Sequence, residues 1–354
     1  MKKLLKHPVF ITIVTVVLIA ILPYILPKPK TPKLKDNELR ALALSEKMLP
    51  TPTNYKELLK VVDTKNNPLS KEKIELGKKL FFDTTLSKDK TLNCASCHIL
   101  EEGGDDNRAF AIGYKGRGNP AHLNSPTVLN SALFNYEFWD GRVHTVEEQA
   151  GGPIQAPFEM AMSKEEVVKR LKTNPNYVKS FKKIFGEINF ENVKKAIGAY
   201  ERTLITHGAY DKFIEGNNSA ISSSAKRGLT LFLTKGCKGC HSGMSFGGQT
   251  MQKFPLHFYF EDYLFKVKRS PYPFENIGGF MGAEGTLKFR VPSLRNIDKT
   301  APYFHNGVEK ELKEVVRIMS KYQLGDEFNK TQINDVVEFL KTLNGKIVEY
   351  NITQ

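Results

Sequence analysis

The sequence predicts a mainly α-helical chain in which two similar domains follow an N-terminal membrane anchor. Three observations lead to this fold class. A pentapeptide occurs twice, a longer pattern is repeated after each copy, and an uncharged apolar segment lies near the N-terminus. The pentapeptide has the form Cys-x-x-Cys-His, and its two copies are Cys94 to His98 and Cys237 to His241.

The repeated pentapeptide is the attachment pattern of a c-type haem, in which two thiols bind the porphyrin and the histidine binds the iron. One copy alone could be half of a zinc site or a redox-active cysteine pair. Two copies that use all four cysteines of the chain favour two haems. The predicted haem-binding residues are Cys94, Cys97 and His98 for the first haem, and Cys237, Cys240 and His241 for the second.

Length and composition are consistent with two soluble haem domains. The 354 residues leave room for two domains of ordinary size, and the apolar share of 40% is that of a soluble globular protein. The net charge of +14 includes seven lysines before Asp36. A basic body suits an acidic electron donor or an anionic membrane surface, although a merely solvated surface is an equal alternative. Neither finger spacing nor an aromatic-basic strip supports nucleic-acid binding.

The N-terminal segment from Val9 to Leu26 has no charged residue and follows three lysines. Its length is near the lower limit for a membrane-spanning helix. A cleaved signal peptide is the rival interpretation, but no Ala-x-Ala-like site follows the segment. We therefore expect residues 1–34 to form an anchor and a basic tether. Because c-type haem is attached outside the cytoplasm, the body should lie on the periplasmic side of the bacterial inner membrane.

Corresponding motifs before and after each pentapeptide indicate an ancient duplication. Gly77 to Phe81 and Gly228 to Phe232 share a Gly-x-x-Leu-Phe pattern with helical spacing. Further along each half, Pro126 to Asn130 matches Pro292 to Asn296. The sequence thus predicts two cytochrome-c-like haem domains of one fold. Their expected limits are residues 35–209 and 210–354.

The two halves differ where the sixth iron ligand would come from. Met319 could supply an axial thioether in the second half, which would make that haem an electron-transfer centre; the alternative is a core methionine. In the first half, Gln149 and Glu159 occupy an apolar, proline-bounded setting. An amide can hold a bound oxidant, and a carboxylate can move a proton between two peroxide oxygens. The alternatives are surface polar residues, or Met160 or Met162 as a ligand.

At these residues the chain resembles the bacterial di-haem cytochrome c peroxidase family, from about Glu75 to Gly345. The segments that carry the resemblance are Leu76 to Asp83, Gly103 to Asn107, Asn124 to Thr127, Phe138 to Arg142, Pro153 to Gln155, Glu159 to Met162, Ala301 to Gly307 and Tyr322 to Gly325.

The resemblance implies a division of labour between the haems. The first would be the low-potential peroxidatic centre, and the second, with His241 and Met319, the high-potential centre that receives electrons. Gln149 and Glu159 would line the peroxide pocket, with Glu159 as the acid–base residue. Trp139 would conduct electrons between the haems. The implied partners are hydrogen peroxide, a small cytochrome c or copper protein as donor, and a second copy of the chain in a homodimer.

The resemblance also implies a calcium ion between the domains. Its protein ligands would be Asn124 and the backbone carbonyls of Thr300 and Pro302. Oxygen donors of this kind suit calcium.

One departure from the family concerns the resting first haem. Many members carry a histidine in a Gly-His pair that caps this iron, and here Tyr114 follows Gly113 instead. The iron could be open without prior reduction, Tyr114 could bind it as a phenolate, or His122 could replace the missing histidine. We favour the open iron.

Two other functions are compatible with a di-haem chain. A related di-haem oxidase acts on a protein side chain, but it has a tyrosine at the position of Met319. A non-catalytic electron relay would need two strong ligands on each iron.

Overall fold

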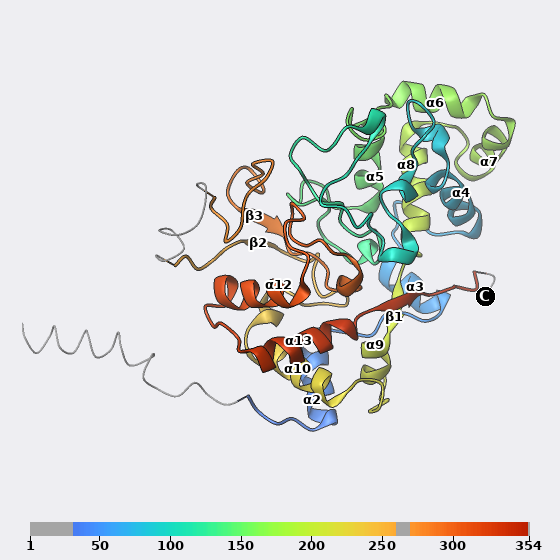
Figure 1. Ribbon diagram of the computed structural model, residues 1–354. Coiled ribbons are helices and arrows are strands. Elements are labelled where there is room, and N and C mark those ends of the chain that lie inside the picture. Colours follow the sequence, from blue (N-terminus) through green and yellow to red (C-terminus); the bar gives the residue numbers. More distant parts are fainter. Residues whose placement is uncertain (1–30, 260–269, 353–354) are drawn as a thin grey trace, which may run out of the picture. The chain divides into compact units, whose positions relative to one another are not determined.

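A computed structural model describes residues 31–259 and 270–352 of the chain (Figure 1). The chain divides into two units, Met1–Lys33 and Leu34–Gln354. Every described helix and strand lies in the second unit.

The described residues form a mainly helical fold, as predicted. Its α-helices are α2 (Asp36–Ser45), α3 (Tyr55–Val62), α4 (Lys71–Phe81), α5 (Val146–Gln155), α6 (Lys164–Lys172), α7 (Pro175–Phe185), α8 (Phe190–Glu201), α9 (Ala209–Ile214), α10 (Ser223–Thr234), α12 (Leu312–Ile318) and α13 (Lys330–Lys341). The strands are β1 (Thr206–Gly208), β2 (Met251–Lys253), β3 (Lys288–Arg290) and β4 (Gly345–Ile347), and they form two antiparallel pairs, β1 with β4 and β2 with β3.

The repeated Gly-x-x-Leu-Phe motif marks a close helix–helix contact in each half. Gly77 on α4 faces α8, where an added Cβ would lie 1.9 Å from the carbonyl oxygen of Ala196. Gly228 on α10 faces α13, where an added Cβ would lie 1.9 Å from the carbonyl oxygen of Asp335. Only glycine permits backbones to approach this closely. The predicted duplication therefore corresponds to two equivalent helix pairs, α4 with α8 and α10 with α13.

Each helix pair belongs to its own hydrophobic core. The first helix and the last strand of the described chain each pack against the core of the other half. Leu39 and Ala43 of α2 pack into the core around α10 and α13, although the sequence places them in the segment 35–209. At the other end, Ile347 of β4 packs against the core around α4 and α8. Figure 1 shows α2 beside α10, and β4 running toward β1 and α3. Apolar burial thus ties each terminal segment to the other half of the body.

The structure does not support the membrane anchor that was part of the predicted fold class. Within residues 31–259 and 270–352, no helix has both the length and the apolar character needed to cross a membrane. The segment from Val9 to Leu26 lies outside the described residues. The described residues thus support two helical cytochrome-c-like domains and give no support to the anchor.

Candidate active site: two haem cavities

The second cavity, defined by Cys237, Cys240, His241 and Met319, has a volume of about 220 Å³. Cys237 begins the 3₁₀ turn Cys237–Gly239 that follows α10, and Cys240 comes directly after this turn. Met319 begins the π-helical turn Met319–Gln323 that follows α12. Such π-helical turns are frequent at functional sites. Apolar side chains from α12 and α13 complete the wall: Leu312, Val315, Val316, Val336 and Leu340. An apolar cavity bordered by two thiols, an imidazole and a thioether fits a c-type haem.

The His241 ring is oriented for iron binding by a backbone contact. Its Nδ1 lies 3.1 Å from the carbonyl oxygen of Phe246. Since a carbonyl can only accept, Nδ1 carries the hydrogen, and Nε2 is left free to bind a metal. Burial lowers the pKa of His241 to about 4, so the ring is neutral near pH 7, as an iron ligand must be.

The first cavity, defined by His98, Gln149, Glu137 and Glu201, is smaller, at about 40 Å³. The His98 ring has the same support as its counterpart, because its Nδ1 lies 3.1 Å from the carbonyl oxygen of Gly104. Cys94 begins the 3₁₀ turn Cys94–Ser96 just before this histidine. The turn, the cysteine spacing and the aimed histidine match those of the second cavity and therefore fit a second haem.

The two cavities share part of their walls. Pro126 and Thr127 border both of them. Farther along the chain, Phe138 borders the first cavity and Trp139 borders the second. The Trp139 indole N–H donates to the carbonyl oxygen of Asn124 at 2.9 Å, which fixes the ring in this wall. Two consecutive aromatic residues therefore border different cavities.

Glu159 lies close to the first haem motif, outside the residues that border the first cavity. Burial raises the pKa of the Cys97 thiol, and the charges of Asp106 and then Glu159 add to this shift, so the Glu159 carboxylate is within electrostatic reach of the haem-binding cysteine. Burial raises the pKa of Glu159 to about 6, and the positive charge of Arg142 opposes this shift. The carboxyl group is therefore mostly ionised at pH 7 and able to accept a proton.

Comparisons with known proteins identify this arrangement. The di-haem cytochrome c peroxidase family matches residues 71–219, and the cytochrome c family matches residues 225–344. Cytochrome c551 peroxidase of Nitrosomonas europaea is 40% identical over 289 residues, which are 80% of this chain and 84% of that protein. This chain belongs to the di-haem cytochrome c peroxidase family. It is an oxidoreductase that carries two c-type haems.

Two further relatives agree with this assignment. Cytochrome c551 peroxidase of Pseudomonas aeruginosa is 38% identical to this peroxidase over 294 residues, which are 81% of this chain and 82% of that protein. The crystal structure of a MauG-like protein associated with microbial copper homeostasis superposes with a TM-score of 0.67 at 27% identity. That match covers 82% of this chain and 94% of the solved one.

The candidate resting ligands of the first haem are held by other contacts in the peroxidase. The backbone N–H of Tyr114 donates to the carbonyl oxygen of Glu159 at 2.7 Å, which ties this loop to the residue expected to act on peroxide. The ring of His122 lies 4.1 Å from that of Phe110, centroid to centroid. Neither Tyr114 nor His122 is among the described residues that border the first cavity. The other candidates, Met160 and Met162, are buried in the core around α4 and α8.

The residues expected to bind calcium come together beside the second cavity. Asn124, Thr300 and Pro302 all border it. The Asn124 amide nitrogen lies 3.4 Å from the carbonyl oxygen of Pro302 and donates to the carbonyl oxygen of Arg108 at 2.8 Å. Among the described residues, His, Cys, Asp and Glu form no group of three or more suited to a metal ion. Any cation here would depend on amide and carbonyl oxygens.

Two buried carboxyl groups at the first cavity escaped the sequence analysis. Glu137 is 6% exposed and Glu201 is 4% exposed, and burial raises the pKa of both, that of Glu137 to about 8. The Glu201 position had a signal, because it follows the apolar Ile197 by one helical turn and thus shares the buried face of α8. Glu137 lies in an irregular segment, where no periodicity indicates which side chains are buried.

Proposed function

We propose that this peroxidase reduces hydrogen peroxide to two waters at the first haem, with two electrons received at the second haem from a small cytochrome c or copper protein. Two protons complete the balance. The observation that carries the proposal is the difference between the cavities. Met319 and His241 both border the second cavity, whereas His98 borders the first cavity together with Gln149, whose amide is not a strong iron ligand. This asymmetry supports one sealed iron and one that is open to a small oxidant.

The residues around the first haem divide the proton chemistry between them. The bound haem supplies an iron that can bind peroxide and accept electrons. Gln149 borders the first cavity and would hold the peroxide by hydrogen bonds from its amide. Glu159, with its pKa of about 6, would take a proton from one peroxide oxygen and deliver it to the other as the O–O bond breaks.

Electrons would cross from the second haem to the first by way of Trp139. The indole borders the second cavity and its neighbour Phe138 borders the first. The hydrogen bond of Trp139 to Asn124 fixes the ring. We further propose that no side chain caps the first iron at rest, so that the enzyme is active without prior reduction. The tethering of the Tyr114 loop and the contact of the His122 ring with that of Phe110 support this proposal.

A calcium ion held by Asn124 and the carbonyls of Thr300 and Pro302 is the third part of the proposal. Oxygen donors at the boundary of the two halves suit this cation. Elemental analysis should find one calcium per chain in the wild-type protein and a clear loss in Asn124→Ala. Equal calcium in both proteins would contradict this ligand set.

The attachment of c-type haem supports a periplasmic location, and a homodimer is proposed from the family. Sedimentation of the holoprotein would test the dimer directly.

Peroxide-dependent oxidation of a reduced cytochrome c, followed optically, tests the main function. The holoprotein should oxidise the cytochrome only after hydrogen peroxide is added. A matched control, Cys94→Ala with Cys97→Ala, should keep the second haem but lose turnover. Wild-type protein with both haems attached and no peroxide-dependent oxidation would refute the proposal and favour an electron relay.

A further inference from the structure

In the first half, a hydroxyl group holds the loop that aims the proximal histidine. The Thr127 hydroxyl donates to the carbonyl oxygen of Gly103 at 2.6 Å. The next carbonyl in the chain, that of Gly104, accepts the hydrogen bond from His98. The backbone N–H of Val128 also donates to the Gly104 carbonyl oxygen, at 2.9 Å, so the Thr127–Val128 segment holds the carbonyl that orients the imidazole.

The second half repeats this arrangement at the equivalent positions. The Ser293 hydroxyl donates to the carbonyl oxygen of Ser245 at 2.8 Å. Again the next carbonyl, that of Phe246, accepts the hydrogen bond from His241. The duplicated sequence therefore builds the same device twice.

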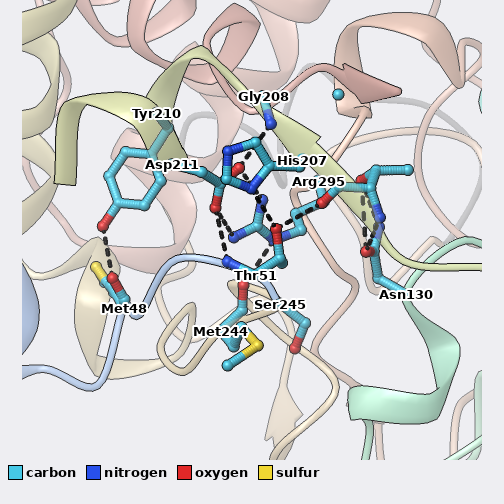
Figure 2. Close-up of polar contacts among 12 residues, drawn as sticks. Met48, Thr51, Asn130, His207, Gly208, Tyr210, Asp211, Met244, Ser245 and Arg295 are labelled. Carbon is cyan, nitrogen blue, oxygen red and sulfur yellow. Dashed lines mark hydrogen bonds and ion pairs between the residues drawn. The ribbon is translucent and has the colours of Figure 1, made fainter. Parts of the chain in front are cut away.

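The halves diverge two residues after this hydroxyl, where Leu129 in the first half corresponds to Arg295 in the second. Arg295 is 1% exposed, and its Nε donates to the carbonyl oxygen of Met244 at 2.7 Å. Its terminal nitrogens donate to both carboxylate oxygens of Asp211 at 2.8 and 3.0 Å. Asp211 also accepts from the backbone N–H of Thr51 (Figure 2). The loop after His241 is therefore fastened to α9 and to the N-terminal segment, and the first half has no such arginine.

The acceptor residue itself shows how firmly the second loop is held. Phe246 has a left-handed backbone with φ of +54°, which is costly for an aromatic residue, whereas Gly104 adopts φ of +83° freely. The Phe246 ring is fully buried and lies 4.9 Å from that of Tyr210. The guanidinium carbon of Arg295 lies 5.6 Å from the same ring. Such a conformation persists only when its surroundings determine it.

We propose that the Asp211–Arg295 pair is a positioning device for the second haem: it fixes the Met244–Phe246 loop and hence the carbonyl that accepts the His241 hydrogen. The inference rests on the proposed binding of the second iron by His241. A carbonyl held against Nδ1–H makes the imidazole a stronger donor, which favours oxidised iron. When the loop loosens, this bond weakens and the second haem becomes easier to reduce. The first haem, which has Leu129 at the matching position, gains no such support.

The test replaces the pair in the full-length holoprotein by Arg295→Leu with Asp211→Asn. Leucine is the residue that the first half uses, and asparagine avoids a buried unpaired carboxylate. An optical redox titration should show the reduction equilibrium of the second haem shifted toward the reduced form by roughly tenfold, with that of the first haem unchanged. The low-spin resonance of the second haem should also broaden. An unchanged midpoint and line shape of the second haem would overturn the inference.

Two comparisons make the result specific. Arg202 and Glu147 form another buried ion pair, with side chains 6% and 11% exposed, so Arg202→Leu with Glu147→Gln is a matched control. This control should leave the reduction equilibrium of the second haem unchanged. An equal shift in the control would mean that losing any buried ion pair loosens the protein, and would refute a positioning role. Arg295→Lys keeps the charge but loses the bidentate hydrogen bonding to Asp211. It should shift the reduction equilibrium of the second haem in the same direction by a smaller amount. If the double variant does not fold, the lysine variant decides.

Wild-type measurements separate this inference from the proposed function. If the wild-type protein turns over peroxide but the reduction equilibrium of the second haem does not shift in the variants, only the positioning role is refuted. A wild-type second haem without histidine ligation would refute both.

Discussion

Replacement of Glu159 by glutamine tests the proposed proton transfer with little change in shape. The amide keeps the size of the side chain but cannot accept a proton from peroxide. Positioned acid–base groups contribute typically about 10²- to 10⁴-fold in rate. We therefore expect the rate of peroxide reduction to fall by at least about 100-fold, which corresponds to roughly 3 to 5 kcal/mol in the activation free energy.

The pH dependence of the peroxide reduction rate tests the same role of Glu159 in a second way. Burial raises the pKa of Glu159 to about 6, and the ionised form is the one that can act as a base. The wild-type rate at low peroxide should therefore be level above about pH 7 and fall tenfold per pH unit well below pH 6. The residual rate of Glu159→Gln should lack this decline.

The assay is steady-state oxidation of reduced cytochrome c at several peroxide concentrations, with both haems counted optically in each variant. Glu165→Gln on α6 is a suitable control, because Glu165 is exposed and far less perturbed by burial. It should retain the wild-type rate and pH profile. A Glu159→Gln protein with two haems that keeps more than a tenth of the wild-type rate, or keeps the acidic limb, would refute the reasoning.

Three further predictions concern other residues. Met319→Ala should retain both haems but lower the reduction potential of the second, because the thioether favours reduced iron; an unchanged potential in a redox titration would exclude this ligand. Trp139→Phe removes the hydrogen bond to Asn124 and the indole path, so stopped-flow transfer between the haems should slow at least about tenfold, while haem content stays the same. Glu137 has its pKa raised by burial to about 8, above its unfolded value, so the folded state holds the extra proton and stability is lost as pH rises from about 4.5 to 8. Glu137→Gln should remove at most about 5 kcal/mol of this pH dependence in denaturant unfolding, and identical slopes in both proteins would contradict it.

The duplicated motifs predicted much of the fold because each one marks a geometric requirement. Gly77 and Gly228 are glycines because helix backbones meet there; the sequence predicted the repeated helices, and the structure adds the contacts. The Cys-x-x-Cys-His motif likewise fixes its local geometry, since the turn, the thiols and the imidazole lie within five consecutive residues. Features determined by local sequence were therefore predictable.

Features that depend on distant residues were not predictable in this way. The Asp211–Arg295 pair joins residues 84 positions apart, and the repeated motif that contains Arg295 does not indicate its partner Asp211. The packing of α2 on the core around α10 and α13 also depends on long-range burial, which apolar spacing within the helix does not reveal. The predicted anchor rested on the hydropathy and flanking lysines of a segment that lies outside the described residues, and no helix of the described residues supports it.

The most direct test is electron paramagnetic resonance of the holoprotein, recorded fully oxidised and again after one electron has been added per chain. We predict a high-spin signal from a first iron without a sixth side-chain ligand in both states, beside a low-spin His/Met signal from the second haem that disappears on reduction. Two low-spin haems with strong side-chain ligands in both states would contradict the account, because no iron would then be free to meet peroxide.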